Sequence, residues 1–573
     1  MTASATDFIE FDPADCFAPS EVLASSGWHY RDYQVRSFEA VDAAFAEVGR
    51  VLVVQATGTG KTVLFTYLAN QVVRAGGRVL IIAHSEELLD QAADKLLRST
   101  GLVAALEKAD EHASLHEGVV LASVQTLARD SRLNGWPADH FNLVIVDECH
   151  RAMAKSYRKI LAHFTGKVLG VTATADRGDK KSLAEIFERC AFEFNLLEAV
   201  REGWLVRPVV KTMPLTIDLK GVKTSRTQQG SDYDLTEVAH RIEPFISEIA
   251  RLMAVEVVGR GQGIVFLPSV ATAGMMAAAL REHGVGAAMV SGECEDRAEK
   301  IAAFKAGELR AVCNAMLLIE GFDHDAVDWI CVLRPTKIRS LYVQAAGRGT
   351  RMLNGIVAAV NASSDAKTRR RLIAESAKPT LLILDFLWLT EKLDLIAPVH
   401  LVAKNEEVAK QMLKEPKDGD LIEMEAGAER DLLAALEKAV KANRTKKSRV
   451  IDPLAFAVSI HADDLATYEP KDRWEFRPPS PEQIKLLENN GLNAATVATA
   501  GMASRLIDKV VSRARLGLCT PKQMTFLERL GYKDASMMTR EAAGAIITQQ
   551  MVDWRNKRGS IPVVTAQSEF THA

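Results

Sequence analysis

Residues 51–62 read VLVVQATGTGKT: four apolar residues, a turn rich in glycine and threonine, and then a lysine and a threonine. The apolar run predicts a strand buried on both faces of a parallel sheet, and a helix is expected to follow. A glycine-rich turn between a strand and a helix directs backbone N–H groups and the helix dipole toward a phosphate. The stretch therefore predicts a nucleotide site on an α/β fold, although Gln55 replaces the first glycine of the strict pattern.

The side chains of this turn indicate how a nucleotide would be held. We expect Lys61 to reach the β- and γ-phosphates and the Thr62 hydroxyl to bind Mg²⁺. The phosphates would be surrounded by the residues of the turn itself, which are Thr57, Gly58, Thr59 and Gly60. An ordinary glycine-rich turn is the alternative, and the strand and helix on either side argue against it.

Two adjacent carboxylates, Asp147 and Glu148, follow the apolar run at 143–146. Carboxylates at the end of a buried strand cost free energy unless they meet a cation or water. Asp147 is suited to bind Mg²⁺, and Glu148 to orient or deprotonate an attacking water. Such a pair alone would usually lie on the surface, but downstream of a P-loop it predicts a catalytic metal site.

Short apolar runs of this kind recur along the chain. They lie at 51–54, 79–83, 119–122, 143–146 and 168–171, and again at 264–267, 287–290, 311–313, 330–333 and 381–384. Two such series predict an α/β fold with two tandem doubly wound parallel-sheet domains, each with its sites at the carboxyl ends of its strands. We place the domains at 25–215 and 236–400, after an N-terminal tail at 1–24, with a polar loop between them.

The composition changes after Phe386. Residues 401–476 are rich in charge and predict a helical connector, which includes a basic run without acids at 441–449. Residues 477–573 predict an all-α region, because SPEQIKLLENNG at 480–491 recurs as TPKQMTFLERLG at 520–531. Ser or Thr before Pro starts a helix, and the glycine ends it. Two copies of a two-helix unit are the simplest interpretation, and chance similarity of capped helices is the alternative.

The overall composition sets limits on function. A chain of 573 residues predicts roughly four domains. Its 71 basic and 74 acidic residues give a net charge of −3, which excludes binding of nucleic acid by bulk charge alone but not local basic patches. We expect a cytoplasmic protein, because no apolar run is long enough to span a membrane and residues 1–16 lack the pattern of a secretory signal. The seven scattered cysteines argue for a reducing compartment and against zinc.

The second domain carries the sequence QAAGRGTR at 344–351. Arg348 and Arg351 are three residues apart, so they would share one face of a helix. Pointed across a cleft toward a γ-phosphate, they would stabilise its charge as arginine fingers. A solvated basic helix is favoured if the stretch is taken alone, and it is disfavoured beside the P-loop and the Asp147-Glu148 pair.

Together these motifs resemble those of superfamily 2 helicases and translocases with a DECH-type second motif. The matching segments are 31–34 (Q-type), 55–62 (I), 83–91 (Ia), 122–127 (Ib), 147–150 (II), 172–174 (III), 263–269 (IV), 320–323 (V) and 344–351 (VI). Their order and spacing agree over about residues 25–390. The run LRPTKIRSLYVQAAGRGTR at 333–351 is most similar to the RadD-like and type III restriction translocase group.

The resemblance implies two RecA-like domains that bind ATP and Mg²⁺ between them. Arg31 and Gln34 would read adenine, and the second wall of the cleft would be formed by Gly321, Asp323 and Gln344. Coupling of hydrolysis to movement would fall to His150, Thr172 and Thr174. A nucleic-acid backbone would be held by His84, Ser85, Ser123, Gln125, Thr126, Ser269 and Asn314, although each residue alone is more often a loop-capping group.

The implied activity is that of an ATP-dependent helicase or translocase, with DNA as the favoured substrate and little base specificity. An RNA helicase is one alternative, and an ATPase scaffold that recruits protein partners through the C-terminal repeats is another. The chain departs from RadD-like members, which carry cysteine clusters after the motor. A basic cluster at 367–371 contains Arg369, Arg370 and Arg371, which would either grip nucleic acid or lie on a solvated helix.

Overall fold

The computed structural model describes residues 30–558 with gaps. The gaps are 85, 174–181, 216, 218, 220, 228–229, 293, 316–321, 323, 388–395, 415–417, 444–452, 454–455, 458–459, 461, 463–464, 466–467 and 533. The chain forms two compact units, 1–429 and 430–573, and each is described by itself. No helix in the described ranges is both long and apolar enough to cross a membrane.

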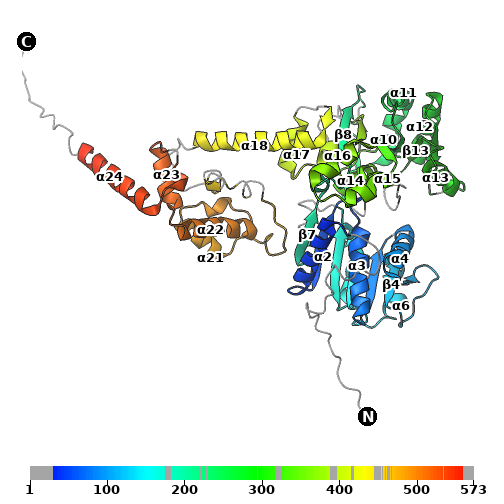
Figure 1. The fold of residues 1–573 in the computed structure, drawn as a ribbon, viewed down its shortest axis with the longest axis horizontal. Helices are drawn as coiled ribbons and strands as arrows, with labels where there is room; N and C mark the ends of the chain where they lie inside the picture. Colours follow the sequence, from blue (N-terminus) through cyan, green and yellow to red (C-terminus); the bar gives the residue numbers. More distant parts are fainter. Residues whose placement is uncertain are drawn as a thin grey trace, which may run out of the picture. The chain divides into compact units, whose positions relative to one another are not determined.

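The first domain contains a seven-stranded parallel sheet (Figure 1). Its strands are β1 (Arg50–Gln55), β2 (Val79–Ala83), β3 (Ala105–Glu107), β4 (Val119–Ser123), β5 (Leu143–Asp147), β6 (Lys167–Thr172) and β7 (Arg189–Phe194), in the order β3-β4-β2-β5-β6-β1-β7. Its helices are α2 (Asp32–Phe45), α3 (Lys61–Arg74), α4 (Glu86–Thr100), α5 (Val124–Leu127), α6 (Asp130–Leu133), η2 (Cys149–Arg151), α7 (Lys155–His163) and α9 (Leu196–Arg201).

Both faces of this sheet are covered by helices, which explains why its strands are continuously apolar. Val51 and Val53 of β1 join a core that includes Leu64 of α3. Leu52 and Val54 alternate with them and face a second core. Successive side chains of a strand point to opposite faces, so a strand between two helical layers needs an apolar residue at every position.

The second domain repeats this arrangement. Its strands are β8 (Arg207–Thr212), β11 (Gln262–Phe266), β12 (Ala287–Val290), β13 (Ala311–Asn314), β14 (Val327–Val332), β15 (Thr380–Asp385) and β16 (Gly419–Asp420), in the order β12-β13-β11-β14-β15-β8-β16. All pairs are parallel except β16 on β8. Its helices are α10 (Leu235–Ile242), η3 (Glu243–Phe245), α11 (Ile246–Glu256), α12 (Val270–Glu282), α13 (Arg297–Lys305), α14 (Arg339–Gly347), η5 (Arg348–Thr350), α15 (Asn354–Asn361), α16 (Ala366–Ala374), η6 (Pro398–Leu401) and α17 (Glu406–Leu413).

The two tandem RecA-like domains predicted from the sequence are confirmed. Each of the ten apolar runs overlaps a strand of one of the two sheets. The boundary between the domains differs from the prediction. Strand β8 falls inside the range 25–215 expected for the first domain, yet it pairs along its whole length with β15 of the second sheet. Strand pairing is a long-range choice between two sheets, so local composition does not reveal it.

The predicted polar loop between the domains is in fact a β-hairpin. It consists of β9 (Thr224–Thr227) and β10 (Gly230–Tyr233), paired antiparallel. Asp232 is buried there and accepts hydrogen bonds from the Thr336 hydroxyl (3.0 Å) and the Lys337 backbone N–H (2.9 Å). Its carboxylate also lies 3.3 Å from Arg334 Nη2. One buried carboxylate thus secures a hairpin that hydrophobic patterning could not indicate.

The start of the predicted connector contacts both domains. Its long helix is α18 (Leu421–Asn443), which begins directly after β16. Arg201 forms an ion pair with the buried Glu425 (2.8 Å), and Arg207 forms one with Asp420 (2.8 Å). The basic run at 441–449 lies mostly outside the described residues.

The second unit contains the two repeats as pairs of helices. Its elements are α21 (Pro481–Asn489), η7 (Ala494–Thr496), α22 (Ala500–Arg515), α23 (Pro521–Arg529), η8 (Ala535–Met537) and α24 (Arg540–Arg558). Ser480 caps α21 and Thr520 caps α23, each in a capping box with a glutamine three residues later. The repeats share one hydrophobic core, which includes Leu487 and Leu527. Equivalent caps at the same offset agree with a duplicated unit.

We expect Gly263→Ala to destabilise the second domain. Gly263 of β11 pairs with Trp329 of β14, and a Cβ atom at Gly263 would lie 2.0 Å from the indole ring. The ring has no room to withdraw because Trp329 is fully buried, so the free energy of unfolding should fall by roughly 1–3 kcal/mol. Denaturant unfolding followed by tryptophan fluorescence measures this change.

The matched control is Gly274→Ala on α12 of the same domain. A Cβ atom at Gly274 would meet no atom within 4 Å. Alanine is the better helix former, so this variant should be as stable as the wild type or more stable by roughly 0.5–1 kcal/mol. Equal stability of Gly263→Ala and the wild type would contradict the packing argument.

Candidate functional site

The turn between β1 and α3 has the shape of a phosphate-binding loop. Gly58 and Gly60 have φ angles of +86° and +85°, a left-handed conformation that favours glycine. The Thr59 carbonyl accepts hydrogen bonds from the Tyr33 hydroxyl (2.6 Å) and from Gln55 Nε2 (3.2 Å). Gln55 therefore holds the turn from the position where the usual pattern has a glycine. A Cβ atom at Gly60 would also lie 3.0 Å from the Gln34 amide, which leaves little space for any side chain.

Glu148 lies between the two domains and touches residues of both. Its carboxylate is 3.4 Å from Lys61 Nζ of the first domain. It also accepts a hydrogen bond from Gln344 Nε2 of α14 in the second domain (3.1 Å). His150 Nδ1 is 3.4 Å from the same carboxylate and 3.4 Å from the Thr172 hydroxyl. Residues predicted for motifs I, II and VI therefore meet at one carboxylate, and Thr172 of motif III reaches it through His150.

The two adjacent carboxylates are electrostatically different. Burial, together with the charge of Glu148, raises the pKa of Asp147 to about 6, although Lys61 opposes the shift. Burial would also raise the pKa of Glu148, but Lys61 and His150 outweigh it and hold that pKa well below its usual range. The backbone of Glu148 is left-handed (φ +49°), which is rare for a residue with a side chain. Glu148 is thus kept ionised in a strained position, while Asp147 favours a cation beside it.

Arg348 and Arg351 reach the cleft differently from the prediction. They do not share a helix face, because α14 ends at Gly347 and Arg351 is extended (φ −68°, ψ 142°) after η5. Arg348 Nη1 donates a hydrogen bond to the Phe322 carbonyl (2.9 Å). The Arg351 side chain lies against the phosphate-binding turn, since a Cβ atom at Gly58 would be 3.1 Å from its Cγ. Burial lowers the pKa of Arg351 to about 10, so the guanidinium remains charged at neutral pH.

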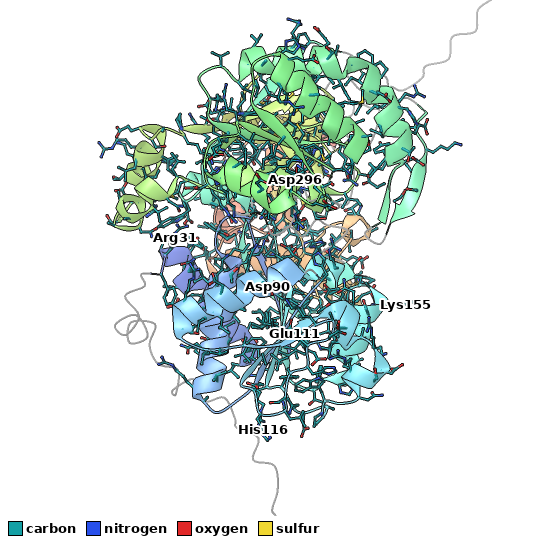
Figure 2. The ribbon with its side chains drawn as sticks, turned by 90° about the vertical axis from the view of Figure 1, so that its right-hand side faces the viewer. Arg31, Asp90, Glu111, His116, Lys155 and Asp296 are labelled. Atoms are coloured by element: carbon teal, nitrogen blue, oxygen red, sulfur yellow. The ribbon has the colours of Figure 1, made fainter. Side chains whose placement is uncertain are left out.

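A cavity of about 440 Å³ opens beside the turn. It is lined by both domains, with Arg31, Gly58 and Trp204 on one side and His324, Asp325 and Arg351 among the residues on the other. Arg31 lies where the domains meet, and its Nε donates to Asn361 Oδ1 (3.1 Å) (Figure 2). Gln34 is buried, and its Oε1 accepts from the Arg31 backbone N–H (2.9 Å), so adenine reading by Gln34 stays a prediction.

Trp204 is an interdomain residue that the sequence did not reveal. Trp204 is 2% exposed, and two guanidinium groups lie over its ring, that of Arg31 at 5.1 Å and that of Arg369 at 4.1 Å from the ring centroid. Tyr33 packs edge-on against the same ring. An isolated tryptophan between a helix and a strand carries no sequence signal for this role. Only the approach of α2 and α16 shows that it joins the domains.

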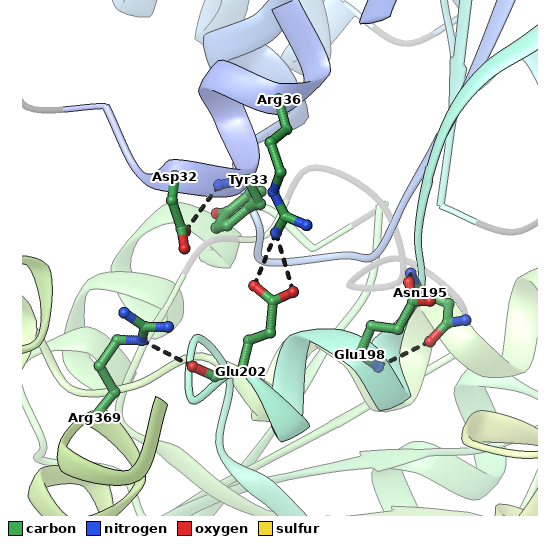
Figure 3. A network of polar contacts seen from close by, with 7 residues as sticks. All are labelled: Asp32, Tyr33, Arg36, Asn195, Glu198, Glu202 and Arg369. Atoms are coloured by element: carbon green, nitrogen blue, oxygen red, sulfur yellow. Dashed lines mark hydrogen bonds and ion pairs between the residues drawn. The ribbon is translucent and has the colours of Figure 1, made fainter. Parts of the chain in front are cut away.

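The predicted basic cluster has a structural role in the described conformation. Arg369 is 4% exposed, and its Nε donates to the Glu202 carbonyl (2.8 Å). Arg370 donates to the Arg201 carbonyl at the end of α9. Arg36 holds the Glu202 carboxylate from α2 at 3.0 Å (Figure 3). The end of α9 is therefore held from both domains. Of the three predicted arginines, Arg369 is buried, whereas Arg370 and Arg371 are exposed.

The other residues predicted to bind nucleic acid differ in their exposure to solvent. Ser123, Thr126 and Asn314 are buried, so their polar groups face the protein. Ser269 caps α12 by accepting from the Thr272 backbone N–H (3.2 Å). Gln125 is exposed and donates to the His84 carbonyl (2.9 Å), which links motifs Ia and Ib.

Both His84 and Gln125 line a second interdomain cavity of about 560 Å³. Ser231 of the β9–β10 hairpin and Lys337 line it from the second domain. Four predicted residues, Ser85, Thr174, Gly321 and Asp323, lie outside the described residues.

Comparison with known proteins agrees with this geometry. Residues 28–177 match the family model of the type III restriction enzyme, res subunit, and residues 246–353 match that of the helicase conserved C-terminal domain. Both matched domains are similar to those of helicases and restriction enzymes, in agreement with the motifs that resemble superfamily 2. The matched ranges contain the phosphate-binding turn, Glu148 and Gln344, so the superfamily 2 motifs and the structural site coincide.

Three curated proteins are similar to parts of this chain. The chain is 30% identical over 347 residues to a Saccharomyces cerevisiae protein named as an ATP-dependent helicase, IRC3, covering 56% of this chain and 49% of the relative. It is 30% identical over 339 residues to a Schizosaccharomyces pombe protein named as a mitochondrial ATP-dependent helicase, covering 57% and 55%. It is 27% identical over 219 residues to the type I restriction enzyme EcoAI endonuclease subunit of Escherichia coli, covering 35% and 26%. The chain thus spans about half the length of the yeast relatives it matches.

We expect Arg369→Ala to weaken the contact between the domains. It should not change the number of contacts with nucleic-acid phosphates. The substitution removes the cation above Trp204 and the hydrogen bonds to the partly buried carbonyls of Glu202 and Ser363. The free energy of unfolding should fall by roughly 1–3 kcal/mol. Denaturant unfolding and the salt dependence of DNA affinity measure the two effects.

Arg371→Ala is the matched control, since Arg371 lies exposed on the same helix. It should change the free energy of unfolding by less than roughly 0.5 kcal/mol. A reduced salt dependence of DNA binding in Arg369→Ala, without loss of stability, would show that this arginine contacts phosphate instead.

Proposed function

We propose that this chain is an ATP-dependent helicase or translocase whose substrate is DNA. One observation carries the proposal: Lys61 from the first domain and Gln344 from the second both contact the Glu148 carboxylate, at 3.4 and 3.1 Å. An ionised carboxylate can orient or deprotonate a water, and Gln344 reaches this one only when the domains are together. Hydrolysis and domain closure are then linked by geometry.

The residues at the phosphate-binding turn fit a nucleotide with Mg²⁺. The raised pKa of Asp147 shows a carboxylate that a cation would stabilise, and Thr62 lies in the first turn of α3. The Thr57 hydroxyl is buried and has no hydrogen-bond partner among the described residues, which suits an incoming phosphate oxygen. Asp147 and Thr62 would hold Mg²⁺, which when bound neutralises phosphate charge. Lys61 would add a second positive charge.

The second domain would supply further positive charge near the phosphates. Arg351 lies against Gly58 and Arg348 follows α14 directly, so both would reach the phosphates from across the cleft. Arginines in such a position stabilise negative charge that develops during phosphoryl transfer. The cavity of about 440 Å³ beside Arg31 has room for the nucleoside. Loss of the γ-phosphate would remove the shared ligand of the two domains and let the cleft open.

The second cavity, of about 560 Å³, offers a place for a nucleic-acid backbone. His84 and Gln125 line it from the first domain, and Ser231 and Lys337 line it from the second. Hydroxyl, amide and cationic groups suit phosphates and carry no base information. A substrate that contacts both domains would move in steps as the cleft opens and closes.

DNA is favoured because the relatives include an endonuclease subunit of a type I restriction enzyme. A protein partner for the C-terminal repeats stays a prediction. A cytoplasmic location also stays a prediction, since the S. pombe relative is named as mitochondrial.

We expect Glu148→Gln to lower the nucleic-acid-stimulated ATPase rate by roughly 10²- to 10⁴-fold, because the amide cannot accept a proton from water. Lys61→Ala should also abolish ATPase, and it should weaken nucleotide binding because a phosphate contact is lost. The rates should be measured with duplex DNA, single-stranded DNA, forked DNA and RNA at one stated salt concentration. Glu111→Gln, an exposed site on the first domain, is the matched control and should behave like the wild type.

ATPase that no nucleic acid stimulates, or full activity in Lys61→Ala, would refute the motor. Stronger stimulation by RNA than by any DNA would favour an RNA helicase. If Glu148→Gln kept biological function while deletion of 477–573 abolished partner binding, the protein would be a scaffold.

A further inference from the structure

Lys378 is a buried lysine that the proposed motor does not yet use. It precedes β15, and its side chain is 2% exposed. Its Nζ donates hydrogen bonds to the Arg351 carbonyl (2.7 Å) and to the Asp325 carbonyl (2.6 Å). Lysine is almost never fully buried unless its charge is paired, and here the acceptors are two backbone carbonyls.

The backbone of Arg351 lies outside a helix, so its carbonyl has to find a hydrogen-bond donor elsewhere. Arg351 follows the last residue of η5 and has extended backbone angles, so helical hydrogen bonding does not hold it. Its side chain nevertheless lies against Gly58 in the phosphate-binding turn. A hydrogen bond to the carbonyl of this residue restricts the direction in which its side chain leaves the backbone.

The second acceptor completes a closed set of contacts. The Asp325 carboxylate accepts a hydrogen bond from the Asn354 backbone N–H (2.6 Å). Lys378 therefore links Asp325, two residues before β14, to Arg351 at the start of the segment 351–354. The Asp325 carboxylate links the same position to Asn354 at the end of that segment. Asp325, Arg351 and Asn354 all line the cavity of about 440 Å³. The ammonium group of Lys378 thus holds together the segments that bring Asp325, Arg351 and Asn354 to the proposed ATP cleft.

We propose that Lys378 is a positioning residue for Arg351, holding its backbone so that the guanidinium points at the phosphates of ATP. The inference rests on the proposed function, since it requires ATP to be hydrolysed in this cleft. Lys378 itself lies behind Arg351, and its ammonium group donates to the backbone carbonyls of Asp325 and Arg351.

Burying the charged Lys378 side chain costs free energy, which supports a role for this residue beyond packing. Burial lowers the pKa of Lys378 to about 7, while Asp328 and Asp325 partly offset the effect and Arg351 adds to it. A folded pKa below the usual value means that the unfolded chain binds more protons between about pH 7 and 10.5. Stability therefore rises with pH through this window, and the cost of the buried ammonium is largest at pH 7 and below.

The test is a double-mutant cycle with Lys378→Met and Arg351→Ala, read by ATPase kinetics of the full chain. Lys378→Met should lower kcat by roughly 10- to 100-fold, because a small misplacement of a charged group is costly. The affinity for a fluorescent ADP analogue should change less than two-fold. If Lys378 acts through Arg351, the double variant should be no slower than Arg351→Ala alone.

The matched control is Arg310→Met, combined with Arg351→Ala in the same way. Arg310 Nη2 also donates to two backbone carbonyls of the second domain, those of Val257 and Arg260 (2.8 Å each). Arg310→Met should lower the melting temperature but leave kcat close to that of the wild type. Lys378→Gln, which keeps amide donors without charge, should show an intermediate kcat and serves if the methionine variant does not fold.

The outcomes separate the two proposals. A wild-type chain without ATPase activity overturns the proposed function. An active wild type with unchanged kcat in Lys378→Met or Lys378→Gln, or with effects of Lys378→Met and Arg351→Ala that multiply, overturns the role of Lys378. Non-additive loss of kcat with preserved nucleotide affinity supports it.

Discussion

The carboxylate of Glu148 is the group on which the proposed chemistry depends. Lys61 and His150 of the first domain keep it ionised, and Gln344 of the second domain donates a hydrogen bond to it. An ionised group in this largely enclosed place requires such neighbours, because burial alone would raise its pKa. The arrangement exists only while the domains are together, so in the proposed motor the geometry of this one side chain would connect hydrolysis to movement.

The shape of the rest of the cleft depends on contacts of backbone atoms as well as on contacts between side chains. Tyr33 and Gln55 fix the Thr59 carbonyl and with it the left-handed turn. Trp204 and Arg369 hold the end of the first domain against α16. Gly347 at the end of α14 packs so closely on Thr57 that a Cβ atom would lie 2.8 Å from its Cβ. These contacts determine how near the arginines come to the phosphate-binding turn.

Residues with similar sequence signals have different roles in the structure. Arg351 and Arg369 are both arginines in basic segments of the second domain, yet one lies against Gly58 and the other packs on Trp204. Ser123 and Gln125 are both polar residues of one motif, yet one is buried and the other exposed. A side chain's environment depends on elements distant in the sequence, which motif spacing does not describe.

The local elements of this protein can be predicted from its sequence: the apolar strands, the glycine turn after β1, the adjacent carboxylates after β5 and the capped helices of the repeats. These follow from periodicity, turn chemistry and helix capping, which act over a few residues. Four features emerge only in the folded chain: the sheet to which β8 belongs, the hairpin secured by Asp232, the cation–π contacts of Trp204 and the burial of Lys378. Each of these joins segments far apart along the chain, where the free energy comes from packing and hydrogen bonds that form only when the domains fold.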